Sequence, residues 1–206
     1  RGEAVAARIG GRFFACDVAD PESWRELVQR VLAEVGRPDS VHLNAGIMSV
    51  PPDEPFVRLE DLPLERYRKI VGVNLDGVVF GLRALLPHLR GRDGAIAITA
   101  SVAGVVGVPE DPIYTATKHA LVGLVRALAA DPTLAPLRIV AICPGGVATA
   151  ITPAAMRDGR FPIMAPDVMA REVVDLLENG KSGEVRLRVS ERQPAFSIEQ
   201  PALAYD

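Results

Sequence analysis

The chain has 206 residues, which suits one domain that buries about 70% of the surface its unfolded form exposes. Apolar residues make up 49% and charged residues 24%, so the composition excludes disordered and fibrous classes. The net charge of −3 gives no electrostatic basis for binding nucleic acid or an anionic membrane. No uninterrupted apolar run approaches the roughly 20 residues of a membrane span. We therefore expect neither kind of partner.

Strand and helix patterns alternate along the chain. Residues 2–11 resemble the end of a helix stopped by two glycines, and residues 12–18 are a short apolar run that predicts a buried strand. Asp20 as N-cap and Pro21 as first residue predict a helix that ends at Gly36. The remaining predicted elements are strands at 40–46, 94–101, 137–146 and 183–190, and helices at about 64–89, 112–130 and 165–180.

Most of these strands are continuously apolar, which is typical of a parallel sheet covered on both faces. Together with the alternation, this predicts an α/β protein with a doubly wound parallel sheet. We expect a single domain over residues 1–190 and a C-terminal tail over residues 191–206.

Polar and glycine residues gather where the predicted strands end. They are Asp17, the "NAG" of residues 44–46, Ser101, and the "PGG" of residues 144–146. In a doubly wound sheet, ligands bind outside the carboxyl ends of the strands. We therefore expect the functional site at this edge.

Tyr114 and Lys118 lie four residues apart in a predicted helix, so they share one face. A neighbouring cation favours tyrosinate, and this would bring the phenol pKa towards the range where general acid–base catalysis works best. The alternative is a surface tyrosine with an unrelated lysine. A chance pair at this spacing is expected only about 0.04 times per chain, which disfavours the alternative.

Two further polar residues have two interpretations each. Ser101 could bind a substrate oxygen, although a serine at a strand end more often makes a turn. Asn74 interrupts a predicted apolar helix, where asparagine is a poor helix former. It could satisfy the backbone of a neighbouring segment, or it could bind a water beside the lysine.

These motifs, in this order and spacing, resemble the short-chain dehydrogenase/reductase family from about residue 4 to residue 190. The matching stretches are "DV" at 17–18, "NAG" at 44–46, Asn74, Ser101, "YTATK" at 114–118 and "PGGVAT" at 144–149. The resemblance implies a Rossmann-like fold and an NAD(P)-dependent oxidoreductase that interconverts a secondary alcohol and a ketone.

The resemblance also implies roles for individual residues. Tyr114 would be the acid/base, with Ser101 orienting the reacting oxygen. Lys118 would lower the tyrosine pKa and bind the nicotinamide ribose, and Asn74 would hold a relay water. The residues implied to contact the cofactor, NAD or NADP, are Asp17, Val18, Asn44, Ala45, Gly46, Tyr114, Lys118, Pro144, Gly145, Val147 and Thr149. No metal site is expected.

The sequence also departs from the family pattern. No glycine-rich turn precedes residues 12–18, and in a sheet of order 3-2-1-4-5-6 these would form the third strand and residues 40–46 the fourth. Those two strands would not be neighbours. We therefore expect roughly 40 further N-terminal residues in the parent protein, two strands and helices. The residue that selects NAD or NADP would lie among them.

An apolar rim predicts a lipophilic substrate, although Arg157 and Arg160 lie in the predicted lid. The rim residues are Ile47, Met48, Val102, Val105, Val106, Val108, Ile151, Met156, Phe161, Ile163 and Met164. Small residues on the helix of residues 112–130, together with the resemblance, predict a homodimer or homotetramer paired through this helix and that of residues 64–89. Two cysteines inside apolar runs suit a cytoplasmic protein.

The competing interpretation is a non-catalytic nucleotide-binding regulatory protein on the same fold. The presence of Ser101, Tyr114 and Lys118 argues against it, because a sensor does not need an acid/base set.

Overall fold

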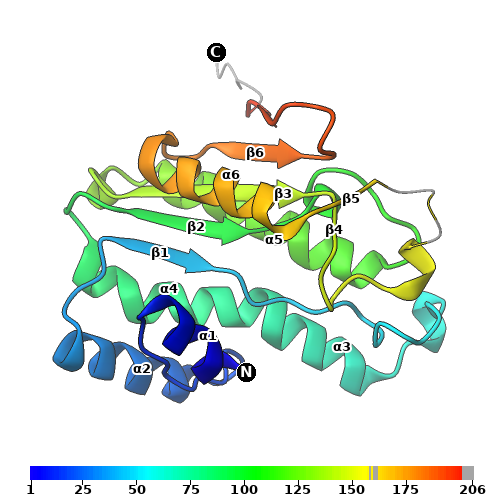
Figure 1. Cartoon of the computed structure of the whole chain (residues 1–206), viewed down its shortest axis with the longest axis horizontal. Helices are drawn as coiled ribbons and strands as arrows, with labels where there is room; N and C mark the ends of the chain where they lie inside the picture. The colour runs from blue at the N-terminus through cyan, green and yellow to red at the C-terminus, as the bar shows by residue number, and fades with distance from the viewer. Residues whose placement is uncertain (158, 160–161, 201–206) are drawn as a thin grey trace, which may run out of the picture.

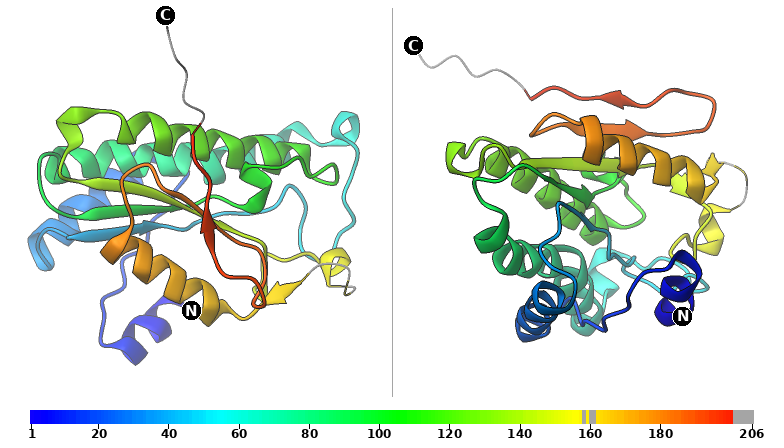
Figure 2. Two further views of the ribbon diagram at one scale, coloured as in Figure 1. Left: turned by 90° about the horizontal axis from the view of Figure 1, so that it is seen from above. Right: turned by 60° about the vertical axis from the view of Figure 1, so that its left-hand side comes forward.

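A computed structural model describes residues 1–157, 159 and 162–200, and it shows a central sheet with helices on both faces (Figures 1 and 2). The helices are α1 (Gly2–Ile9), α2 (Pro21–Glu34), α3 (Leu64–Val71), α4 (Gly77–Leu89), α5 (Pro112–Ala129) and α6 (Pro166–Asn179). The strands are β1 (Ser40–Leu43), β2 (Ala95–Thr99), β3 (Arg138–Pro144), β4 (Gly146–Val147), β5 (Ile163–Met164), β6 (Val185–Arg188) and β7 (Phe196–Ser197). The single-turn helices are η1 (Leu59–Asp61), η2 (Gly72–Asp76), η3 (Val102–Gly104), η4 (Pro132–Leu134) and η5 (Ala154–Met156).

The main sheet has the order β1-β2-β3-β6-β7, and its first four strands are parallel. Parallel pairing follows from the chain path, because a helix crosses over between each strand and the next. The prediction of an α/β protein with a parallel sheet is confirmed. Strands β4 and β5 form a separate parallel pair beyond the end of β3.

Alternate residues of the strands pack against different helices. Ile96 and Ile98 of β2 lie in one apolar cluster with Leu121 and Val125 of α5. Ala97, between the two isoleucines, lies in a second cluster with residues of α6. Because successive side chains of a strand point to opposite faces, a continuously apolar strand must be covered on both sides.

Residues 12–18 do not form the predicted strand. Within the described part of the chain this segment pairs with no strand, Val18 lies in a turn, and β1 forms a ladder only with β2. A strand is defined by its ladder of backbone hydrogen bonds, so an apolar sequence alone is not sufficient. The segment is still attached to the core, because the Trp24 indole donates a hydrogen bond to the Val18 carbonyl at 3.1 Å.

The region predicted as a tail contains a strand. Strand β7 pairs antiparallel with β6, and the Ile198 amide donates to the Val185 carbonyl at 3.0 Å. The boundary between a domain at 1–190 and a tail at 191–206 stays a prediction, and residues 201–206 lie outside the described residues.

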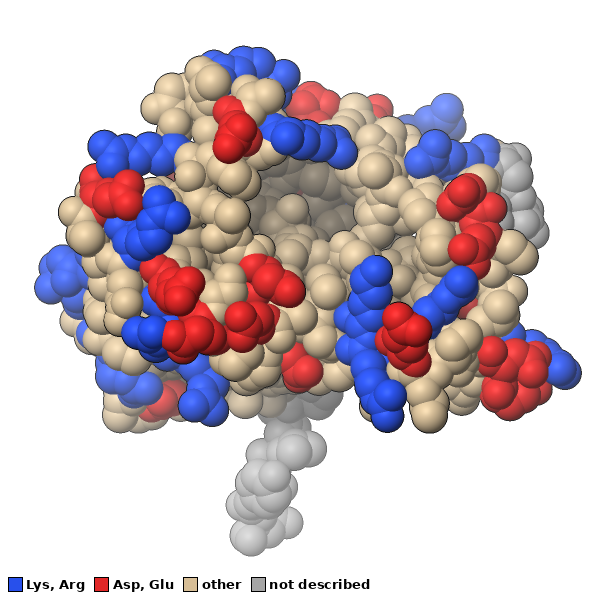
Figure 3. Space-filling model, turned by 90° about the horizontal axis from the view of Figure 1, so that it is seen from below, with Lys and Arg blue, Asp and Glu red and all other residues tan. Residues whose placement is uncertain are grey.

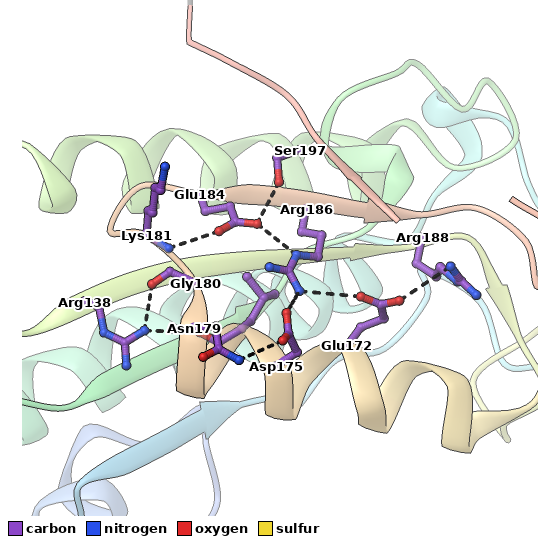
Figure 4. A network of polar contacts seen from close by, with 11 residues as sticks. Arg138, Glu172, Asp175, Asn179, Gly180, Lys181, Glu184, Arg186, Arg188 and Ser197 are labelled. Atoms are coloured by element: carbon purple, nitrogen blue, oxygen red, sulfur yellow. Dashed lines mark hydrogen bonds and ion pairs between the residues drawn. The ribbon is translucent and has the colours of Figure 1, made fainter. Parts of the chain in front are cut away.

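Ion pairs join β6 to α6 at this edge, and a hydrogen bond adds β7 to the same network (Figure 4). Arg186 of β6 contacts Asp175 and Glu172 of α6, and it also donates to Glu184 at 2.9 Å. The Ser197 hydroxyl of β7 donates to the same Glu184 carboxylate at 2.7 Å. Because the Arg186 and Glu184 side chains are each only 14% exposed, this network is better shielded from solvent than ordinary surface pairs.

The predicted helix of residues 64–89 is continuous but irregular. Its middle turn, η2, is π-helical and contains Asn74. The whole helix has 26 residues and a mean hydropathy of 1.5 in its most apolar window, so by length and composition alone it could cross a membrane. Core helices of soluble proteins pass the same test. Here the helix packs against α2 and α5.

We predict that Leu121→Ala lowers the free energy of unfolding by about 2–5 kcal/mol, because this α5 side chain is fully buried between helix and sheet. Urea denaturation followed by circular dichroism measures the change. Leu64→Ala is the matched control: Leu64 is 67% exposed, so its loss should be within about 0.5 kcal/mol. Equal losses in the two variants would contradict this account of the core.

Candidate active site

The carboxyl ends of β1, β2 and β3 bring the predicted site residues to one edge of the sheet. Asn44 to Gly46 follow β1, Ser101 follows β2 after one intervening residue, and Pro144 ends β3. Helix α5 starts close to the same edge and carries Tyr114 and Lys118 in its first two turns. Gly104 allows this approach, because a Cβ there would lie 2.7 Å from the Lys118 carbonyl oxygen.

Lys118 is a buried amine, 2% exposed. Its Nζ donates to the Thr99 carbonyl at 2.9 Å and lies 5.5 Å from the centre of the Tyr114 ring. It also lies beside Gly46, where a Cβ would be 3.3 Å from Nζ. Burial lowers the pKa of Lys118 to about 8, because few polar groups replace the lost water.

The pKa of Tyr114 is raised in the structure, whereas the sequence predicts that Lys118 lowers it. Burial raises the pKa of the phenol, hydrogen bonding to Ser101 opposes this, and the nearby Asp111 raises it further. In the protein alone, desolvation therefore outweighs any lowering of the pKa by the lysine. That Lys118 tunes this tyrosine stays a prediction.

Ser101 sits between the end of β3 and the start of η3. Its Oγ lies 3.5 Å from the Pro144 carbonyl and accepts the Ala103 amide at 3.1 Å, which caps η3. Ser101 therefore makes the turn that its sequence position suggested, and its hydroxyl also faces Tyr114. Both interpretations of this serine are compatible with the geometry.

Asn74 is fully buried in the π-helical turn. Its Oδ1 accepts the Ile47 amide at 2.8 Å, and its Nδ2 donates to the Ile47 carbonyl at 2.9 Å and to Thr117 Oγ1 at 3.3 Å. The asparagine thus satisfies the backbone of a neighbouring segment, the first of its two interpretations. π-helical turns are often found at functional sites, and the relay water stays a prediction.

A cavity of about 200 Å³ brings three of the predicted cofactor contacts together: Val18, Asn44 and Ala45. It adjoins an apolar cavity of about 260 Å³, since both are lined by Trp24, His42 and Leu43. Figure 3 shows a broad hollow in the face seen from below, with its charged side chains around the rim. An uncharged concave site of this kind fits part of a dinucleotide.

The other predicted cofactor contacts lie outside this cavity. The exposed Asp17 accepts the Ala19 amide at 2.9 Å, so its carboxylate supports its own turn. Gly145 donates its amide to the Arg188 carbonyl, and Val147 lies in β4. Thr149 is partly buried, and its carbonyl accepts from the Arg157 guanidinium at 3.1 Å.

The rim is less uniform than predicted. Met164 is fully buried in the cluster under α6 with Val140 and Val168, so it does not line a pocket. The prediction of Met164 as a rim residue is therefore wrong. The side chain points inwards because β5 pairs with β4, and no local sequence pattern indicates this pairing. Phe161 and Arg160 lie outside the described residues.

Thr99 is a site residue that sequence reasoning missed. Its carbonyl holds Lys118, and its hydroxyl donates to Asn44 Oδ1 at 2.9 Å. His42 Nε2 lies 2.7 Å from the same hydroxyl oxygen and must donate to it, because the hydroxyl proton is already used. The polar residues His42 and Thr99, each next to apolar residues in its strand, could have signalled this contact.

Comparison with known proteins agrees with this geometry. The short chain dehydrogenase family model matches residues 1–159. The chain is 39% identical over 159 residues to a 2,5-dichloro-2,5-cyclohexadiene-1,4-diol dehydrogenase of Sphingobium indicum, which covers 75% of the chain and 62% of that relative.

Two other relatives have similar coverage. A (-)-trans-carveol dehydrogenase of Rhodococcus erythropolis is 36% identical over 154 residues, 74% of the chain and 53% of the relative. A trans-4-hydroxycyclohexanecarboxylate dehydrogenase of Sinomonas cyclohexanicum is 30% identical over 168 residues, 80% of the chain and 61% of the relative. The chain thus spans less than two thirds of the length of each. The match over residues 1–159 and the convergence of Ser101, Tyr114 and Lys118 lead to one conclusion: the chain belongs to the short-chain dehydrogenase family.

Proposed function

We propose that the protein is an NAD(P)-dependent oxidoreductase that interconverts a secondary alcohol and a ketone. The observation that supports this most is the meeting of a serine, a tyrosine and a buried amine at the edge of the sheet, at Ser101, Tyr114 and Lys118. Burying an amine disfavours its charged form, so a chain that retains one there has a chemical use for it. A regulatory protein that only senses a nucleotide could use the amine to bind it, but would not need a serine and a tyrosine beside that amine for proton exchange.

The proposed roles follow from positions in the structure. Ser101 would donate its hydroxyl proton to the substrate oxygen and orient it, and Tyr114 would give or take the proton of that oxygen. NAD or NADP supplies the hydride chemistry when bound. Val18, Asn44 and Ala45 line the cavity in which we place part of it, and Pro144, Gly145, Val147 and Thr149 would border its nicotinamide end.

Lys118 would contact the cofactor and also influence Tyr114. Its Nζ donates to the Thr99 carbonyl and has two further protons, which could be donated to a ribose hydroxyl. A bound ribose would add a polar partner for the amine and favour its charged form. The tuning of Tyr114 by Lys118 would then appear in the complex, whereas burial dominates in the protein alone.

We propose a ring alcohol as the substrate class. The names of the three relatives describe dehydrogenases of a cyclohexadienediol, of carveol and of a hydroxycyclohexanecarboxylate. All three are alcohols of six-membered carbon rings. The apolar side chains near the site, such as the 49% exposed Val106, suit such a ring.

We also propose a cytoplasmic homodimer or homotetramer. Ala116, Ala120, Gly123 and Ala127 form an exposed row of small residues on α5, opposite the side that packs on the sheet. Such a row would let a partner's helix approach closely in a two-fold contact. Both cysteines of the structure, Cys16 and Cys143, are free thiols, which suits a reducing compartment.

We predict that Tyr114→Phe lowers kcat by roughly 10² to 10⁴, because the ring still fills its place but no proton can be exchanged. Reduced nicotinamide absorbance with a cyclohexanol-type substrate measures the rate, and fluorescence titration should show unchanged cofactor affinity. Tyr67→Phe changes an exposed tyrosine and should keep full activity. A Tyr114→Phe enzyme with most of its activity would refute the proposed acid/base.

We predict that the cost of burying Lys118 depends on pH. Its pKa is about 8 in the folded protein and 10.5 when unperturbed, so between these values the unfolded state binds more protons and stability rises with pH. Relative to Lys118→Met, the wild type should therefore gain about 3 kcal/mol from pH 8 to pH 10.5, and nothing below pH 8. Urea denaturation of both proteins, with their cysteines kept reduced, measures this difference in stability at each pH.

Lys69→Met is the control for this titration. Lys69 is exposed on α3, so the stability difference between this variant and the wild type should not change over the same pH range. If the Lys118→Met curve also ran parallel to that of the wild type, the amine would not be desolvated.

We predict that Gly123→Arg converts the oligomer to a monomer. A Cβ added at Gly123 would meet nothing within 4 Å and the residue is exposed, so the single chain has room for a side chain that would clash with a partner. Static light scattering at micromolar concentration measures the mass, with Gln29→Arg on the exposed side of α2 as control. A monomeric wild type would contradict the proposed contact.

A further inference from the structure

Asp111 is a buried carboxylate next to the proposed acid/base. It precedes Pro112 at the start of α5, three residues before Tyr114, and is 1% exposed. It is the only acidic residue among the buried residues that the structure describes. Burying a carboxylate is costly unless hydrogen bonds replace its water, so its partners show what it is held for.

The two oxygens of this carboxylate bind two different segments. Oδ1 accepts the Tyr114 amide at 3.0 Å, which caps α5. Oδ2 accepts the amide of Ser49 at 2.9 Å, and Ser49 is 62 residues away in the sequence. Charge-assisted bonds of this kind are about twice as strong as neutral ones. Asp111 therefore joins the first turn of the helix that carries Tyr114 to the segment around Ser49.

That segment is fixed at its other end by Asn74. The Asn74 amide binds both the amide and the carbonyl of Ile47, and Asp111 binds the amide of Ser49 two residues further on. Residues 47–49 directly follow Asn44, Ala45 and Gly46, the proposed cofactor contacts. The position of Tyr114 relative to these contacts thus depends on the Asp111 bridge.

Comparison with a second helix start shows how the bridge made by Asp111 differs from ordinary capping. Asp131 also precedes a proline, and its Oδ1 accepts the amide of Thr133 at 2.9 Å. Its side chain is 35% exposed, and its further contacts are the hydroxyl of the same Thr133 at 2.7 Å and an ion pair with Arg90 at 3.4 Å. Capping alone therefore needs neither burial nor an oxygen reserved for a distant backbone amide.

We propose that Asp111 is a positioning residue for the reaction, which holds Tyr114 in register with residues 47–49 and so with the proposed cofactor contacts. The expected effect on turnover rests on the proposed function, but the bridge itself can be tested without measuring turnover.

The charge of Asp111 provides that test. The groups that face the Tyr114 phenol are Ser101, Lys118, Asp111 and Cys143. Burial raises the pKa of Tyr114, Ser101 lowers it, and the negative charge of Asp111 raises it further. Burial also raises the pKa of the Cys143 thiol to about 11, so this group is neutral at physiological pH. Removing the Asp111 charge should therefore make Tyr114 easier to ionise.

The experiment uses Asp111→Asn in a background where Tyr67 and Tyr205 are replaced by phenylalanine. Tyr114 is then the one tyrosine that remains of the three in the sequence. The asparagine keeps the shape and one acceptor oxygen, but its NH₂ group cannot accept the amide of Ser49. Phenolate absorbance as a function of pH reports the ionisation of Tyr114. We expect it to move to lower pH in Asp111→Asn and to stay unchanged in the control, Asp131→Asn.

Kinetics on the unmodified background give the second readout. We expect Asp111→Asn to lower kcat by roughly 10- to 100-fold, with a smaller change in KM and an acidic shift of the pH profile. Asp111→Ser, which keeps a capping hydroxyl but cannot bridge, should lose kcat similarly while retaining its fold.

The outcomes separate the two proposals. An unmoved Tyr114 titration in Asp111→Asn, or kcat within twofold of the wild type in both variants, would overturn the positioning role. A wild type that oxidises no ring alcohol, together with a shifted titration, would overturn the proposed function and leave the bridge to Tyr114 supported.

Discussion

The hydrogen bond from the Lys118 ammonium to the Thr99 carbonyl is the contact on which the site depends. It joins the second turn of α5 to the last residue of β2, and it is made where water is nearly excluded. A buried amine without a partner would be expelled or neutralised, so this carbonyl keeps the amine at the edge of the sheet and adds a polar contact to the apolar packing of α5. Tyr114, one turn earlier on the same helix, is positioned by the same bond.

Around this contact, backbone groups are held mostly by side chains from distant parts of the sequence. Asn74 binds Ile47 from the π-helical turn, Asp111 binds Ser49 from the start of α5, and the Thr99 side chain orients Asn44. Asn74 and Asp111 bind loop amides that have no ladder partner, whereas Thr99 binds the side chain of Asn44 at the start of the same loop. The geometry of the site is thus set by three polar side chains, whereas its overall location is set by the sheet.

Much of the fold could be predicted from the sequence, and so could the edge of the sheet where Ser101, Tyr114 and Lys118 meet, because these depend on local patterns. Apolar runs, helix starts and the four-residue spacing of Tyr114 and Lys118 are such patterns. The partners that hold them are non-local: nothing near Asp111 indicates Ser49, and nothing near Thr99 indicates Lys118. For the same reason residues 12–18 were predicted as a strand, since apolarity is local and strand pairing is not. The burial of Met164 in β5 and the pairing of β7 with β6 could not be predicted for the same reason, because both depend on strand pairing.

The two edges of the main sheet differ in what they offer to another backbone. At one end β7 is only two residues long and runs against the direction of its neighbours. At the other end β1 has four residues, runs with the sheet, and has one free side among the described residues. Short edge strands are poor templates for pairing. The edge that favours pairing with another strand is therefore β1, whose residues His42 and Leu43 line both cavities, so that a backbone joining the sheet there would also lie beside these cavities.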